Sequence, residues 1–212
     1  MEFQLDALTR QLPRFFPTIA NAIQSAYANA NAQMPMEMHR DRLCAKRLYG
    51  FVLPNVDYQL RRAIESAAFP DVNVIAAENS NGSAEHLEVQ TPYGVFVVAK
   101  ARRRKGIPPK AKYRQRYVDQ TFVQQVFPEL EAYSIDCQPL YVITHISALP
   151  DFELSGIGVG RLTVEQNAWS CYYSIDDLCR QEALVETVEK TVSPEVREES
   201  IARIKRVQIK QA

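Results

Sequence analysis

The sequence predicts an α+β protein with an N-terminal helical region, a central and mostly antiparallel sheet of about five strands, and two C-terminal helices. Three observations predict this class. Apolar residues recur at helical spacing before residue 68, they alternate at strand spacing between 71 and 100, and two helix-start signals follow residue 173. With 46% apolar and 24% charged residues, the 212-residue chain has an ordinary globular composition, which argues against long disordered regions.

We expect one compact domain with three regions, because this length suits a single hydrophobic core. Residues 1–68 are predicted to be helical. Residues 69–175 are predicted to form a sheet-containing core that carries a basic loop at 100–116. Residues 176–212 are predicted to form the C-terminal helices, which cover an edge or a face of the sheet.

The helical region is expected to contain four helices. Leucines at spacing three and four mark the first helix, and Thr18 caps a second whose apolar residues recur every four positions. A third helix is predicted over residues 37–49. Pro54 is expected to start a fourth helix, because proline is favoured at the first helical position. The inward residues of these helices are Leu5, Leu8, Leu12, Ile19, Ile23, Tyr27, Val56, Leu60 and Ile64.

The strands follow from alternation and from the turns between them. Residues 71–100 contain three apolar runs separated by an Asn-Gly-Ser-rich cluster and by a Thr-Pro-Tyr-Gly turn, which predicts a three-stranded meander. A short helix is predicted over 118–130, a strand over 140–146, and a strand or hairpin over 152–164. C-terminal helices are predicted to begin at Ser174 and at Ser193, where capping residues and acids cluster.

Three glycines alternate within the 152–164 segment, at Gly156, Gly158 and Gly160. In an extended strand they share one face, which therefore presents bare backbone to a neighbour or a flat ligand. The preferred interpretation is packing, with an aromatic ring such as Trp169, Tyr172 or Tyr173 covering the glycines.

The net charge of zero conceals an uneven distribution. Lys and Arg total 25, as do Asp and Glu, but nine of the basic residues and none of the acids lie within residues 100–116. The remainder of the chain carries 16 basic and 25 acidic residues, a balance of −9. The sequence therefore predicts a local basic surface on an acidic body.

This segment has the chemistry of a phosphate-binding loop. It follows an apolar strand, Gly106 and Pro108-Pro109 prevent a regular helix, and each Lys or Arg that neutralises a phosphate releases counterions. We therefore expect a non-enzymatic, nucleic-acid-binding protein, regulatory or belonging to a mobile element or phage. Two tyrosines would stack on bases and eight cations would contact phosphates. The predicted binding residues are Arg102, Arg103, Arg104, Lys105, Lys110, Lys112, Tyr113, Arg114, Arg116 and Tyr117.

Other interpretations of the basic segment stay open. It could dock on an acidic protein partner, which would make the chain an interaction module such as an inhibitor or adaptor. It could pair with the chain's own acids, or be a solvated loop without a binding role. The basic segment does not distinguish DNA from RNA, because phosphate contacts carry no sequence information.

A metal-dependent nuclease is the enzymatic alternative, using Glu78, Glu88 and Lys100 as the catalytic residues. The arrangement resembles that of PD-(D/E)XK nucleases, in which an acid precedes an acid-x-Lys strand. Here Gln90 stands where that family has lysine, and Lys100 would have to substitute from another strand. In the preferred interpretation the protein has no catalytic residue, no metal ligand and no cofactor.

The remaining features concern location and assembly. Cys44, Cys137, Cys171 and Cys179 have no CxxC spacing, and the acidic N-terminus is unlike a secretory signal, so we expect a cytoplasmic protein with reduced thiols. The longest uncharged run is broken by prolines, which argues against a membrane span. Homodimerisation through the C-terminal helices is a further hypothesis.

Overall fold

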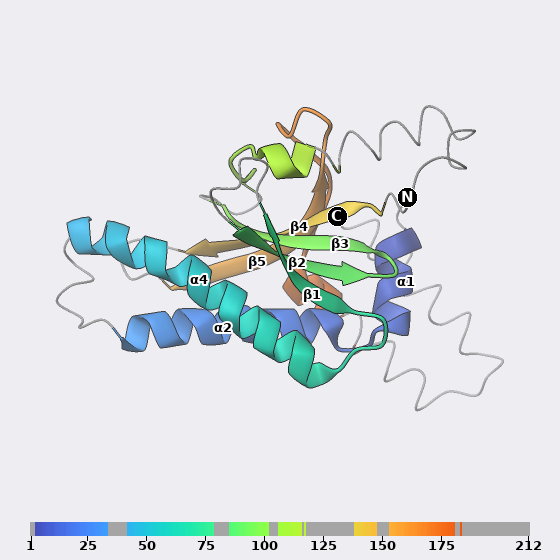
Figure 1. The fold of residues 1–212 in the computed structure, drawn as a ribbon, viewed down its shortest axis with the longest axis horizontal. Coiled ribbons are helices and arrows are strands. Elements are labelled where there is room, and N and C mark those ends of the chain that lie inside the picture. Colours follow the sequence, from blue (N-terminus) through green and yellow to red (C-terminus); the bar gives the residue numbers. More distant parts are fainter. Residues whose placement is uncertain are drawn as a thin grey trace.

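The computed structural model describes residues 3–33, 42–78, 85–101, 106–115, 117, 138–147, 153–180 and 183. Helices α1 (Phe3–Gln11), α2 (Phe15–Ala32) and α4 (Arg42–Ala67) are followed by six strands that form one mixed sheet. In Figure 1, α2 and α4 lie along one side of the sheet, and the short helix over residues 112–115 lies on the opposite side. The predicted α+β class is confirmed.

The six strands are ordered in space as they are in sequence. All neighbours pair antiparallel except β3 and β4, which are parallel, so the mostly antiparallel character is confirmed and the sheet has one strand more than expected. The strands are β1 (Asn73–Glu78), β2 (Glu85–Thr91), β3 (Gly94–Lys100), β4 (Leu140–Ser147), β5 (Leu154–Leu162) and β6 (Trp169–Ser174).

The main hydrophobic core lies between the helices and one face of the sheet. Phe15 and Phe16 of α2 pack edge-on against Phe96 of β3, with ring centroids 5.3 and 6.5 Å apart. Such aromatic pairs add to the stabilisation that burial of apolar surface supplies. The predicted inward positions whose side chains are described all lie in this core: Leu8, Leu12, Ile19, Ile23, Tyr27, Val56, Leu60 and Ile64.

Pro54 does not start a helix, which corrects the sequence prediction. It lies inside α4, which runs without a break from Arg42 to Ala67. A proline within a helix removes one backbone hydrogen bond and crowds the carbonyl four residues earlier, which here belongs to Gly50. Both residues are exposed, so water can solvate that carbonyl, and the buried stripe that includes Val52 and Val56 continues past the proline. Packing of the stripe therefore outweighs the local preference.

The sixth strand, β6, was not predicted, although its aromatic residues were expected to cover the glycines. Gly158 and Gly160 lie on the sheet face opposite the helices, where Tyr172 packs over Gly158 and the Trp169 ring lies against Gly160. The packing interpretation of the glycines is thus confirmed. Gly156 has no described atom within 4 Å of the position that a Cβ would occupy.

Several predicted elements lie outside the described residues. These are the helix over 118–130 and the part of the C-terminal region beyond residue 183. A helix does begin after Ser174, as predicted. Within the described part of the chain, no helix is both long enough and apolar enough to cross a bilayer.

Gly158 and Gly156 provide a matched test of the close packing on β5. Gly158→Ala places a methyl group against the Tyr172 ring, whose Cε2 lies 2.8 Å from that position. We expect Gly158→Ala to lower the free energy of unfolding by about 1–3 kcal/mol, as overpacking usually does. Gly156→Ala should change it by less than about 0.5 kcal/mol. Urea denaturation measures both, and equal effects would show that Tyr172 does not pack on Gly158.

Candidate nucleic-acid interface

The basic segment is the crossover that joins the parallel strands β3 and β4. The backbone N–H of Ala101, just past β3, donates to the carbonyl of His145 on β4 at 3.1 Å. The described residues 106–115 of the segment, and Tyr117 just beyond it, lie over the sheet face that the helices leave uncovered, where Tyr113 and Tyr117 pack on Val97, Val142 and their neighbours. A parallel connection requires such a crossover, so the fold itself places the basic segment on this face.

The β5–β6 turn holds the middle of the segment through a buried glutamine. Gln166 accepts from the backbone N–H of Ala111 at 3.3 Å and donates to its carbonyl at 3.1 Å. Its side chain also donates to Gln115, whose own amide donates to the carbonyl of Val164 at 3.0 Å. These bonds satisfy buried amide groups while fixing the segment to the turn.

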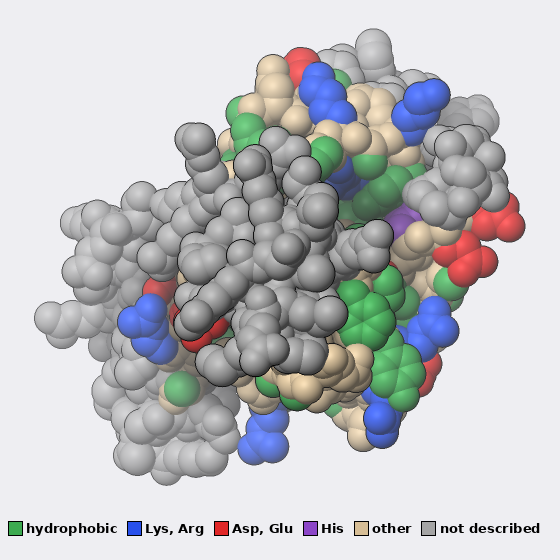
Figure 2. Space-filling view, turned by 90° about the vertical axis from the view of Figure 1, so that its left-hand side faces the viewer, with side chains coloured by type: hydrophobic (Ala, Val, Ile, Leu, Met, Phe, Trp, Pro, Cys, Tyr) green, Lys and Arg blue, Asp and Glu red, His purple; other side chains and the backbone are tan. Residues whose placement is uncertain are grey.

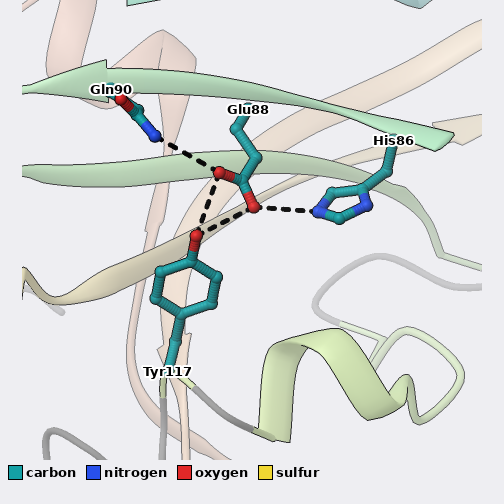
Figure 3. Close-up of polar contacts among 4 residues, drawn as sticks. All are labelled: His86, Glu88, Gln90 and Tyr117. Carbon is teal, nitrogen blue, oxygen red and sulfur yellow. Dashed lines mark hydrogen bonds and ion pairs between the residues drawn. The ribbon is translucent and has the colours of Figure 1, made fainter. Parts of the chain in front are cut away.

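The end of the segment is tied to β2 through Glu88. This glutamate is only 3% exposed, and its two carboxylate oxygens accept from the Tyr117 hydroxyl at 2.9 Å each. One oxygen also contacts His86 Nε2 at 2.9 Å, and Gln90 donates to the other at 3.5 Å. Figure 3 shows three of these side chains projecting from the same side of β2 toward Tyr117. A buried carboxylate needs such partners, so the cluster both stabilises Glu88 and anchors the segment.

Residues of the Glu88 cluster hold both tyrosines in internal contacts. Burial raises the pKa of the Tyr117 hydroxyl, and the adjacent Glu88 carboxylate raises it further through charge repulsion and the hydrogen bond. The Tyr113 ring stacks on His86 with centroids 3.7 Å apart. Both rings were predicted to stack on nucleic-acid bases; in the structure they make internal contacts instead.

Asp57 of α4 adds a second acid to this environment. Burial raises the pKa of its carboxyl group from 3.8 to about 6, and the charge of Arg61, one helical turn further on, lowers it in part. The pKa of Tyr113 is raised mainly by burial, with smaller upward contributions from the charges of Glu88 and Asp57. The electrostatic effect of Asp57 therefore extends to the residues that hold the basic segment.

The predicted phosphate contacts divide into three groups. Lys110 and Lys112 are exposed. Arg114 is only 3% exposed, and its guanidinium donates to the carbonyl of Pro109 and lies 5.6 Å from the Tyr113 ring, so this side chain packs inside the segment. Arg102, Arg103, Arg104, Lys105 and Arg116 lie outside the described residues. Figure 2 shows Lys and Arg side chains above recessed hydrophobic side chains and a histidine.

The three residues of the nuclease alternative do not converge. Glu88 pairs with Val97 and shares its face of the sheet, whereas Lys100, three residues beyond Val97, points to the helix-covered face. Glu78 is exposed and pairs with Glu85, on the face opposite Glu88. Among the described side chains, no three His, Cys, Asp or Glu residues are arranged to hold a metal ion.

Sequence reasoning missed His86, Gln90 and Gln166 as partners of the basic segment. A signal existed for the first two, because His86, Glu88 and Gln90 alternate on one strand and must share a face. Nothing local marks Gln166, whose partners lie more than 50 residues earlier in the chain.

Comparisons of the chain with protein-family models, with curated proteins and with solved structures found no match.

Removing the Tyr117 hydroxyl tests whether the Glu88 cluster anchors the segment. Tyr117→Phe takes two of the closest contacts from a buried carboxylate, and we expect the free energy of unfolding to fall by about 1–3 kcal/mol. Tyr58→Phe is the matched control, because Tyr58 is 56% exposed. Its effect should stay below about 0.5 kcal/mol in the same urea titration. Similar losses in the two variants would refute the anchoring role.

Asp57 should make the fold less stable at neutral pH than it would be with a neutral residue. Its pKa is raised in the folded state, so the penalty is absent below about pH 3.8, grows as the pH rises, and is complete above about pH 6. Asp57→Asn should therefore raise the free energy of unfolding at pH 7, by on the order of 1 kcal/mol, and leave it unchanged near pH 3.5. Urea titrations at the two pH values measure this, and a gain that does not depend on pH would contradict the assignment.

Proposed function

We propose that this protein binds nucleic acid through the basic segment 100–116, without catalysing a reaction on it. The carrying observation is that nine basic residues and no acid occupy a segment whose described residues 106–115 lie on one face of the sheet. In its described part Lys110 and Lys112 are exposed to solvent, while Gln166 bonds to Ala111 between them and Glu88 bonds to Tyr117 just beyond the segment. Cations held in place lose less conformational freedom on binding than cations on a free loop.

The contacts would be to phosphates rather than to bases. Tyr113 is stacked on His86 and Tyr117 is bonded to Glu88, so neither ring is presented to a base in this arrangement. Lysine and arginine contacts to phosphates give affinity that falls steeply with salt and discriminates poorly between sequences. We therefore propose a binder that recognises the backbone.

The proposal includes a cytoplasmic location, which the free thiol of Cys171 supports. An acidic protein surface is the alternative partner, since exposed lysines attract carboxylates as well as phosphates. A homodimer is compatible with either partner. The nuclease alternative is not taken further, because Glu88 and Lys100 lie on opposite faces of the sheet.

Anisotropy titrations with labelled DNA and RNA oligonucleotides, each at two salt concentrations, test the proposal. Lys110→Gln/Lys112→Gln should weaken binding and reduce the slope of log K against log salt by roughly 2 for duplex DNA. Arg102→Ala/Arg103→Ala/Arg104→Ala should reduce the slope of log K against log salt further. The control for the lysine variant is Arg61→Gln/Arg62→Gln, which also removes two exposed charges, here from α4, and should leave binding unchanged.

Two results would contradict the proposal. If the wild-type chain binds neither DNA nor RNA at low salt, it is not a nucleic-acid-binding protein. If the α4 control weakens binding as much as the lysine variant does, the segment is not the interface. A pull-down with and without nuclease treatment separates the two partner classes, because only a nucleic-acid-mediated complex is lost on digestion.

A further inference from the structure

Strand β1 forms one edge of the sheet (Figure 1), and within the described part of the chain its outer side pairs with no other strand. All six of its residues pair with residues 85–90 of β2 in continuous register. No further backbone hydrogen bond to β1 is made by the residues that the structure describes. Every second residue of an antiparallel edge strand directs its N–H and C=O groups outward, so β1 presents a row of unpaired donors and acceptors.

This edge lacks the features that usually keep edge strands apart. Residues 73–78 contain no lysine, arginine or proline, and their pairing with β2 has no bulge. The four residues from Val74 to Ala77 are apolar, and Ile75 is 38% exposed. Ile75 pairs with Glu88, so its side chain lies on the crossover face, which is the sheet face under the basic segment. An apolar and unbroken edge of this kind favours pairing with another strand.

We propose that β1 pairs antiparallel with β1 of a second copy of this chain, around a two-fold axis perpendicular to the sheet. Such an axis places one residue opposite its own copy. We expect that residue to be Ile75, because this register brings the exposed isoleucines of the two copies together. Val74 of one copy then faces Ala76 of the other, and Glu78, the only charged residue of β1, opposes no charge.

A second copy suits this edge better than an unrelated peptide does. Both copies carry the same unpaired edge, so a single contact satisfies the outward N–H and C=O groups of both, and the two-fold axis closes the assembly at two chains. The pairing involves one short strand from each copy, which places it among small interfaces. We therefore expect a weak dimer, with a Kd of about 1–100 μM.

The dimer would present two basic segments in the same direction. A two-fold axis perpendicular to the sheet keeps each sheet face on its own side, so Lys110 and Lys112 of both copies lie over one continuous face. Two segments that contact one nucleic acid raise its apparent affinity by avidity. This consequence rests on the proposed function, whereas the pairing of β1 does not.

Sedimentation velocity of the full chain, without nucleic acid and over about 1–300 μM, measures the dimer. Ile75→Lys places two lysines opposite each other at the axis, so it should raise the Kd of the dimer by at least about tenfold. Ile107→Lys is the matched control, because Ile107 is also an exposed isoleucine, at 41%, but lies on the crossover. It should leave the Kd unchanged.

Cysteine cross-linking gives a second readout that does not depend on the folding of the lysine variant. Opposite residues of an antiparallel pair have Cα atoms about 4.5–5.5 Å apart, which is within disulfide reach. With diamide as the oxidant, Ile75→Cys should therefore form a disulfide-linked dimer on a non-reducing gel. The wild type and Ile107→Cys control for the four cysteines that the chain already has.

A concentration-dependent dimer that Ile75→Lys weakens and Ile75→Cys cross-links supports the proposal. The proposal is overturned if the wild type stays monomeric at about 300 μM, if Ile107→Lys weakens the dimer equally, or if Ile75→Cys cross-links no more than Ile107→Cys does. A monomer that still binds DNA or RNA overturns the dimer and leaves the proposed function standing. A dimer that binds neither nucleic acid supports the pairing of β1 and overturns the proposed function.

Discussion

The parallel pairing of β3 and β4 is the constraint on which the rest of the structure depends. Every other neighbouring pair in the sheet is antiparallel and needs only a short connection, but this pair requires the chain to return across the sheet. Helices α2 and α4 fill one face with the main core. The described part of the crossover near its middle, residues 106–115 and Tyr117, therefore occupies the other face, where Tyr113 and Tyr117 complete the smaller core.

That crossover is rich in cations, and burying one of its faces calls for polar partners as well as apolar ones. Glu88 is the acid against which the crossover packs. Its carboxylate is only 3% exposed, but its hydrogen-bonding capacity is used by Tyr117, His86 and Gln90. Gln166 does the same for a neutral amide at Ala111. The same stretch of chain thus anchors itself and exposes positive charge. Its tyrosines pack against the sheet, while Lys110 and Lys112 are exposed to the solvent.

Local patterns predicted most of the elements and few of the contacts between them. Strands β1 and β2 and the apolar stripes of the helices follow from the period of their apolar residues, because each buries one side against the core. Strands β3 and β4 follow from short apolar runs, because the first half of β3 and nearly all of β4 are buried on both faces. Pro54 misled the prediction, since an exposed proline next to a strongly buried stripe is tolerated. The parallel pairing, β6 and the role of Gln166 depend on residues far apart in sequence, which no local pattern encodes. For the same reason, the sequence marked Glu88 only as a catalytic residue of the nuclease alternative and not as an anchor.

Strand alternation also changes what the count of nine basic residues means. Lys100 is the last residue of β3, and its side chain points to the helix-covered face next to His145, while Arg114 folds back onto Pro109. At most seven of the nine cations could therefore contact a partner on the crossover face, which limits the proposed slope of log K against log salt to about −6 for duplex DNA. The two inward cations need acceptors inside the protein. Arg114 finds one in the backbone carbonyl of Pro109. The basic residues that are adjacent in sequence are thus divided between two faces of one sheet, with Lys110 and Lys112 exposed on the crossover and Lys100 on the helix-covered face.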